Sequence, residues 1–251
     1  MRVDLNADMG ESFGPWRIGA DVELLEVVTS ANVACGFHAG DADVMAATMA
    51  RAAAKGVGIG AHPGFADLQG FGRRRIKLSA EELGNLTAYQ LGAAQGIALR
   101  AGARVRHLKL HGALSNIASE EPAVARACFE AALAVDPEII FVVLAATPME
   151  AVARDLGARV ACEIFADRAY AEDATLLGRD QPGAVLHDPA EASARVEAML
   201  RAGAILTAAG GRIPCRIDTV CVHGDRPEAV AMARALRRHL TEAGVSLRSF
   251  D

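Results

Sequence analysis

Histidines recur in this sequence where short apolar runs end, each close to a glycine. His38 lies in "CGFHAGD", His62 in "GAHPGF", His111 in "KLHGAL" and His223 in "CVHGD". A single histidine in such a place is more often structural than catalytic, but these four hold equivalent positions on separate runs. Imidazole carries protons near neutral pH and binds metal ions. The four histidines therefore indicate a shared site for acid–base chemistry.

Two carboxylates and one lysine accompany these histidines. Asp8 follows the first apolar run in "NADMGE", and Glu163 interrupts another apolar run, where an unpaired charge would be costly. Lys109 stands two residues before His111, so both side chains are expected on one face of a strand. A buried lysine needs an anionic partner, which is either Glu163 or Asp8 or a substrate carboxylate or phosphate.

Other polar residues at these positions have structural explanations. Asp41 and Asp225 directly precede helical segments, so helix N-capping explains them at least as well as catalysis. Cys35 and Cys221 alternate within apolar runs and are interpreted as buried packing residues. Activated water is therefore favoured over a covalent intermediate.

The elements that must position these residues alternate between strand and helix, which predicts βα units around a parallel sheet. Strands are expected at 3–7, 31–38, 58–62, 107–111, 139–144, 159–165 and 220–223, with a possible last strand at 245–250. Helices are expected at 43–55, 80–100, 121–135, 189–202 and 227–243. Residues 63–78 and 166–186 are expected to be irregular. In such folds, chemistry collects at the carboxyl ends of the strands.

Composition narrows the class of protein. The 251 residues, 52% hydrophobic and without a linker, suit one α/β barrel domain spanning 1–251. The net charge of -5 argues against a nucleic-acid or anionic-membrane partner. No apolar run reaches the roughly 20 residues of a membrane span, no secretory signal is evident, and the expected location is the cytoplasm. Neither a P-loop nor a strand-linked GxGxxG motif is present.

Taken in order, several motifs resemble those of the LamB/YcsF family. They are "DLNADMGESFG", "SANVACGFHAGD", "GAHPGFADLQGFGRR", "KLHGAL", "EIFADRAY", "PGAVL" and "CVHGD", and they extend from Val3 to about Asp225. The resemblance implies an irregular seven-stranded (β/α) barrel similar to the glycoside hydrolase/deacetylase fold. It also implies ATP-dependent 5-oxoprolinase activity, which converts 5-oxo-L-proline, ATP and water into L-glutamate, ADP and phosphate. Two partner subunits, B and C, are implied, with ATP shared among the subunits.

The resemblance also suggests site residues. Leu110 and Ser115 stand where the family usually has proline and tyrosine, whereas Lys109, His111 and Asn116 are kept. The implied catalytic residues are Asp8, His38, His62, His111, Glu163 and His223, and the implied substrate-binding residues are Asn6, Lys109, Asn116, Asp167 and Arg168.

A divalent metal on Asp8, His62 and His111 is an open alternative, because deacetylases of this fold hold an ion with an aspartate and histidines. The HxxxH spacing common in those enzymes is absent here. Two other functions stay open: a stand-alone metal-dependent amidase or deacetylase, and a non-catalytic subunit that binds 5-oxoproline.

Overall fold

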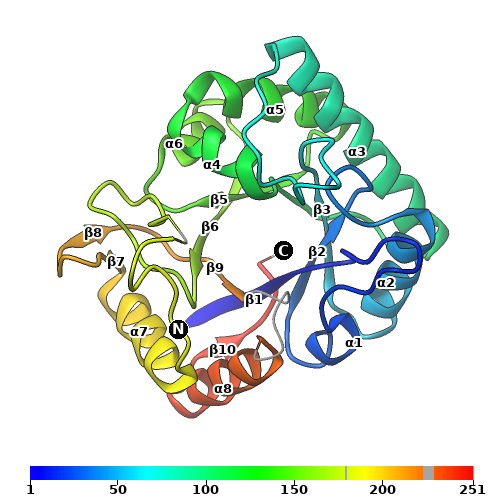
Figure 1. The fold of residues 1–251 in the computed structure, drawn as a ribbon. Helices are drawn as coiled ribbons and strands as arrows, with labels where there is room; N and C mark the ends of the chain where they lie inside the picture. Colours follow the sequence, from blue (N-terminus) through cyan, green and yellow to red (C-terminus); the bar gives the residue numbers. More distant parts are fainter. Residues whose placement is uncertain (179, 223–228, 251) are drawn as a thin grey trace.

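Seven parallel strands close a barrel in the computed structural model, which describes residues 1–178, 180–222 and 229–250. The strand order is β1-β2-β3-β4-β5-β6-β9, and β9 pairs back onto β1 (Figure 1). The strands are β1 (Arg2–Met9), β2 (Ser30–Ala34), β3 (Gly58–His62), β4 (His107–Lys109), β5 (Ile140–Leu144), β6 (Arg159–Phe165) and β9 (Thr219–Val222). The predicted seven-stranded (β/α) barrel is confirmed.

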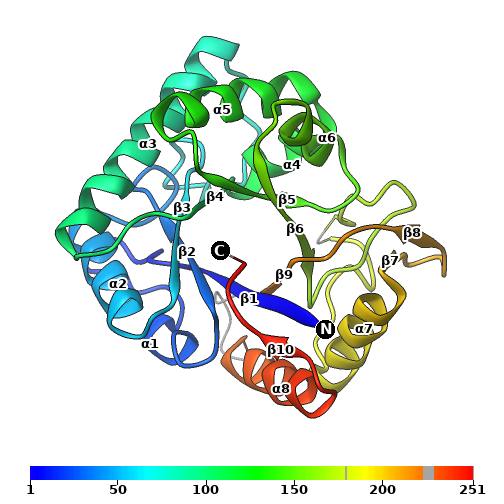
Figure 2. The same ribbon diagram turned by 180° about the vertical axis from the view of Figure 1, so that it is seen from behind.

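Helices surround the barrel on the outside, as both views show (Figures 1 and 2). They are α1 (Asp21–Leu24), α2 (Ala42–Ala54), α3 (Ala80–Arg100), α4 (Gly112–Glu120), α5 (Pro122–Val135), α6 (Pro148–Asp155), α7 (Pro189–Ala202) and α8 (Ala229–Glu242). Within the described ranges, no helix has the length and apolar character needed to cross a membrane. Their buried faces form one large hydrophobic core with the outward side chains of the strands.

Most helix ends follow the local sequence signals. Ser79 and Glu82 form the expected capping box at the start of α3, and Asp188 caps α7 through the Ala190 N–H. Asp41 caps α2 by accepting from the N–H groups of Asp43 and Val44. Thr147 is different: Pro148 begins α6 as predicted, but the Thr147 hydroxyl donates to the Leu144 carbonyl instead of capping the helix.

Three strands, the second, the fourth and the last, are shorter than predicted. β2 ends at Ala34, and the chain then turns through Gly36 and Gly40, which both have positive φ angles, so His38 lies in a loop. β4 ends at Lys109, and His111 is the residue directly before α4. The last strand is reduced to β10 (Ser246–Leu247), which pairs with the start of β1. The chain thus leaves β2 before it reaches His38, and it leaves β4 before it reaches His111.

Further differences concern the segments that connect the barrel strands. Helix α4 was not predicted, nor was the antiparallel hairpin of β7 (Ala204–Leu206) and β8 (Arg212–Pro214). Segments 63–78 and 166–186 are irregular in their described parts, as predicted, apart from the isolated bridges at Arg168 and Tyr170. Both segments border the cavity described next.

Candidate active site

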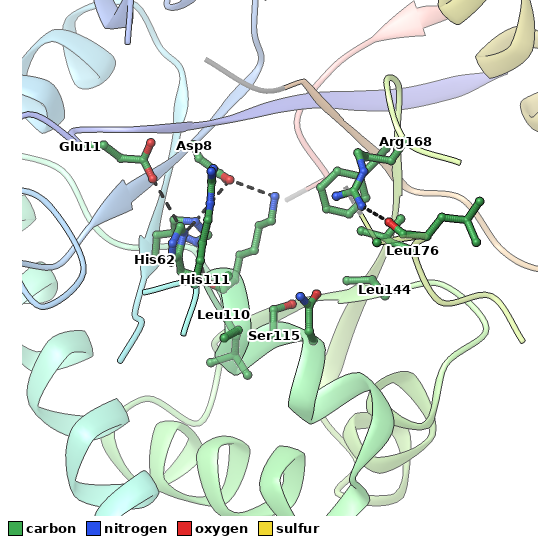
Figure 3. Close-up of a pocket in the computed structure, with 17 residues that line it drawn as sticks. Asp8, Glu11, His62, Leu110, His111, Ser115, Leu144, Arg168 and Leu176 are labelled. Carbon is green, nitrogen blue, oxygen red and sulfur yellow. Dashed lines mark hydrogen bonds and ion pairs between the residues drawn. The ribbon is translucent and has the colours of Figure 1, made fainter. Parts of the chain in front are cut away.

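A cavity of about 260 Å³ opens at the carboxyl ends of the strands (Figure 3). Six of the residues predicted from sequence line it: Asp8, His62, Lys109, His111, Asn116 and Arg168. Three more, Asn6, His38 and Glu163, are almost fully buried next to these. Asp167 follows β6 but is not among the lining residues. His223 and Asp225 lie outside the described residues. The structure therefore brings together nine of the predicted residues.

Lys109 lies at the centre of the barrel end, between two carboxylates. Its Nζ is 2.8 Å from Oε1 of Glu163 and 3.1 Å from Oδ1 of Asp8. It also donates to Sγ of Cys221 at 3.1 Å. Burial disfavours the ammonium, yet the charges of Asp8 and Glu163 raise the pKa of Lys109 well above its ordinary value. Lys109 is therefore a permanent cation at the base of the cavity.

Two asparagines extend this charged centre into the barrel. Asn6 donates to Oε1 of Glu163 at 3.0 Å, and Asn32 donates to Oδ1 of Asp8 at 2.9 Å. Asn32 also donates to Asn6 at 2.7 Å. Because each carboxylate is held by an amide as well as by Lys109, their positions are fixed before any ligand binds.

A group of histidines adjoins Asp8 on the other side. Nε2 of His62 is 3.3 Å from Oδ2 of Asp8 and 3.0 Å from Nδ1 of His111. The His38 ring stacks on the His111 ring with centroids 3.6 Å apart. Glu11, which follows β1, completes the group at 3.5 Å from Nε2 of His38. The predicted metal residues Asp8, His62 and His111 are thus adjacent, although the metal itself stays a prediction.

Burial determines the protonation of this group. The pKa of His38 is lowered well below its usual value, first by burial and then by the neighbouring His111 and His62. Burial and the nearby His62 lower the pKa of His111 to about 3. Both rings are therefore neutral at physiological pH and carry a lone pair that can accept a proton or a metal ion.

Arg168 and Arg73 bring positive charge to the cavity wall. The buried Arg168 donates from Nε to the Ala184 carbonyl and from Nη2 to the Leu177 carbonyl, so it also orders segment 166–186. The Arg73 guanidinium lies 5.0 Å from the centre of the Phe71 ring. Arg74 and Arg75, which follow Arg73 in the sequence, pair with Asp67 and Glu120 and have exposed side chains.

Cys35 and Cys221 are buried, as predicted. Burial raises the pKa of Cys35 to about 12 and that of Cys221 well above its usual value. Neither thiol ionises near neutral pH, so neither is an effective nucleophile.

Sequence reasoning missed three residues of this site. Glu11 lies in "NADMGES" and was quoted but not selected, although it is a carboxylate three residues after Asp8. Asn32 lies inside the apolar strand β2, where a buried amide signals a polar partner. Arg73 lines the cavity but was not selected from the sequence. Two of these residues could have been found from the sequence: Glu11 comes directly after the first strand, and Asn32 is a polar residue inside an apolar strand.

These features define an α/β-barrel protein with an enzyme-like site of histidines, carboxylates and a lysine at the carboxyl ends of its strands. The chain belongs to the LamB/YcsF family, whose model matches residues 3–251. A relative from Ruegeria pomeroyi, named as the A subunit of 5-oxoprolinase, is 60% identical over 100% of this chain and 99% of its own length.

Solved structures agree with this assignment. The lactam utilization protein from Thermus thermophilus superimposes with a TM-score of 0.94 and 44% identity over the whole of both chains. The catalytic domain of a peptidoglycan N-acetylglucosamine deacetylase from Eubacterium rectale matches with a TM-score of 0.52 and 10% identity, covering 99% of this chain and 88% of that one. The second likeness concerns the fold alone, and it confirms the predicted similarity to deacetylase folds.

Proposed function

We propose that this chain is the A subunit of an ATP-dependent 5-oxoprolinase, which converts 5-oxo-L-proline, ATP and water into L-glutamate, ADP and phosphate. The full-length similarity to the 5-oxoprolinase relative from Ruegeria pomeroyi carries this proposal. The cavity supports it independently. Its volume of about 260 Å³ lies below the roughly 300–1,000 Å³ of pockets for drug-sized ligands, which suits a small cyclic amide.

The reaction requires groups that the site contains. A five-membered lactam is an unreactive amide, so phosphorylation of its ring oxygen by ATP prepares it for attack by water. That attack needs a base, a cationic hold on the substrate and hydrogen-bond donors for the developing charge. In the proposal, Asp8 acts as the base with help from His62 or His111. Lys109 and Arg168 hold the carboxylate or phosphate.

The remaining predicted residues have supporting roles in the proposal. Asn6 and Glu163 hold Lys109 in place through the contacts described above. Asn116, which is exposed at the cavity wall, contacts the substrate. His38, His223 and Asp167 stay proposed site residues as the resemblance implies.

The proposal includes partner subunits B and C and places the complex in the cytoplasm. In the proposal, ATP is shared with the partner subunits, as the family resemblance implies. Activity is therefore expected only from the assembled complex.

One observation favours a second candidate, a stand-alone metal-dependent amidase or deacetylase. Glu11, His38, His62 and His111 form a buried group with the geometry of a metal site. A divalent ion there would supply Lewis-acid activation of water or of a carbonyl group. A third candidate, a subunit that only binds 5-oxoproline, makes no use of the neutral histidines.

One experiment separates the three candidates: glutamate release from 5-oxo-L-proline is measured for the purified chain alone and with subunits B and C, each with and without ATP. The proposal predicts turnover only with both partners and ATP. Turnover by the chain alone without ATP would support the second candidate. Full turnover by complexes carrying Asp8→Asn or His111→Ala would leave a binding role only.

A further inference from the structure

His62 and His111 face each other through one ring nitrogen each. Nδ1 of His62 lies 2.7 Å from the Lys109 carbonyl, and Nε2 of His111 lies 2.8 Å from the Phe71 carbonyl. A carbonyl oxygen only accepts hydrogen bonds, so these two ring nitrogens carry the hydrogens. The other nitrogens, Nε2 of His62 and Nδ1 of His111, then present lone pairs to each other across 3.0 Å.

His38 and Glu11 direct further electron-pair donors at the same point. His38 is 1% exposed, and neither of its ring nitrogens has a hydrogen-bond partner. Its Nε2 is 3.5 Å from Oε1 of Glu11, which in turn is 3.8 Å from Nδ1 of His111. One donor atom from each of the four residues lies within 4.8 Å of the others. Buried electron-pair donors this close together are stabilised by a cation placed among them.

We propose that Glu11, His38, His62 and His111 together bind one divalent transition-metal ion of the zinc type. Three imidazoles with one carboxylate suit this class of ion, whose bonds to nitrogen are about 2.0–2.1 Å long. The ligand atoms of a tetrahedral ion with bonds of this length lie about 3.3–3.4 Å apart, so the widest donor pair has to approach by up to about 1.5 Å.

The surroundings of the four side chains are those of metal ligands. Metal-binding histidines almost always donate their second N–H to a carbonyl or carboxylate, and His62 and His111 both do so. Backbone packs closely against His38, because a Cβ added to Gly64 would lie 2.7 Å from its Nδ1. That side of the ring is therefore closed, and Nε2 is left as the ligand atom.

The inference assigns the carboxylate ligand to Glu11 and not to Asp8 of the sequence-based set. Oδ1 of Asp8 already accepts from Lys109 and Asn32. Its Oδ2 is 3.3 Å from Nε2 of His62, but Asp8 is not one of the four residues whose donor atoms all lie within 4.8 Å of one another. Asp8 therefore stays available as the base, next to the ion. This conclusion does not depend on the reaction proposed above, because metal binding is measured without turnover.

The test measures metal binding by the full chain after removal of metals with a chelator. Zn²⁺ is added, excess is removed by gel filtration, and bound zinc is counted by mass spectrometry. Co²⁺ is titrated in parallel, and its visible absorption reports the ligand set. The variants are Glu11→Gln, His38→Ala and Asp8→Asn. His239→Asn is a matched control, because His239 and Glu197 form a histidine–carboxylate pair near the surface.

We expect one zinc ion per chain in the wild type, Asp8→Asn and His239→Asn. Glu11→Gln and His38→Ala are expected to weaken binding at least about tenfold and to alter the Co²⁺ spectrum, with circular dichroism showing retained fold. Glu11→Gln removes one charge and keeps the shape, so it tests the site even if His38→Ala does not fold. The inference is overturned if the wild type binds no stoichiometric metal, which would leave a shared proton as the cation. It is equally overturned if Asp8→Asn loses the ion while Glu11→Gln keeps it.

Discussion

Lys109 and Glu163 form an ion pair 2.8 Å long inside the barrel, and both side chains are almost completely removed from water. The carboxylate depends on this pair, because its second oxygen has no hydrogen-bond partner. We predict that Lys109→Met lowers the free energy of unfolding by about 3–5 kcal/mol, since it leaves Glu163 as a buried unpaired charge. Urea unfolding at pH 7 measures this loss.

The control for this prediction removes both charges. The double variant Lys109→Met/Glu163→Gln is expected to regain much of the lost stability, because the buried charge of Glu163 is gone and Asp8 keeps its hydrogen bond from Asn32. It is expected to stay inactive in the complex, because the cation of the cavity is gone. If the double variant is as unstable as the single one, the ion pair is not the reason for the loss.

Asp4 makes stability depend on pH. Burial raises the pKa of Asp4 to about 6 from its usual 3.8, despite hydrogen bonds from Ser30, Thr219 and Thr29. The folded protein therefore holds this proton up to a higher pH than the unfolded chain does. Between pH 4 and 7, the contribution of Asp4 to the free energy of unfolding falls by up to about 3 kcal/mol.

The Asn variant isolates this effect. Asp4→Asn cannot titrate, so the stability advantage of the wild type over Asp4→Asn is expected to be largest near pH 4 and to shrink toward pH 7. Urea unfolding of both proteins across this range gives the difference at each pH. Parallel stability profiles would mean that Asp4 has an ordinary pKa in the folded state.

Gly72 holds the histidines in position through its lack of a side chain. Its φ is +62°, and an added Cβ would lie 2.7 Å from Cβ of His38 and 2.8 Å from Cδ2 of His111. Gly72→Ala is therefore expected to displace both rings and to lower turnover of the complex by about 100-fold, since shifts of 1 Å have effects of this size. The left-handed backbone adds a stability loss of about 1–2 kcal/mol.

Gly102→Ala is the control that separates backbone strain at a positive φ angle from displacement of the histidine rings. Gly102 has a similar φ of +70°, but nothing lies within 4 Å of an added Cβ. This variant is expected to lose comparable stability and to keep its turnover. Equal turnover in both variants would show that Gly72 does not position the histidines.

The sequence predicted where the site lies because parallel strands place their carboxyl ends at one side of a barrel. Placing His38, His62 and His111 at the ends of expected strands was therefore enough to expect that they meet. The helix caps at Ser79 and Asp41 were also predictable, since they depend on residues at most three positions apart. The hairpin of β7 and β8 carried a turn signal, Gly210-Gly211, that was not used.

The partners of each polar residue were not predictable, because they depend on contacts across the barrel. Lys109 had three possible anionic partners from sequence, and in the structure it contacts both Asp8 and Glu163. Asp4 accepts from Thr219, a residue 215 positions away, only because β1 and β9 close the barrel in that register. Neither spacing nor composition contains this information.

Asp8 lies at the end of β1 and Asp41 follows the neighbouring strand β2, and the two residues have different roles. Asp8 lines the cavity beside Lys109 and His62, whereas Asp41 caps α2 and accepts from the Gly14 N–H. We predict that Asp8→Asn lowers kcat of the complex by about 100- to 10,000-fold, the usual contribution of a general base, with little change in KM or unfolding temperature. Asp41→Asn removes the same charge but keeps an amide oxygen that caps a helix equally well, so its kcat should stay at the wild-type value. Steady-state glutamate formation measures both. A large loss in Asp41→Asn together with normal turnover in Asp8→Asn would reverse these assignments.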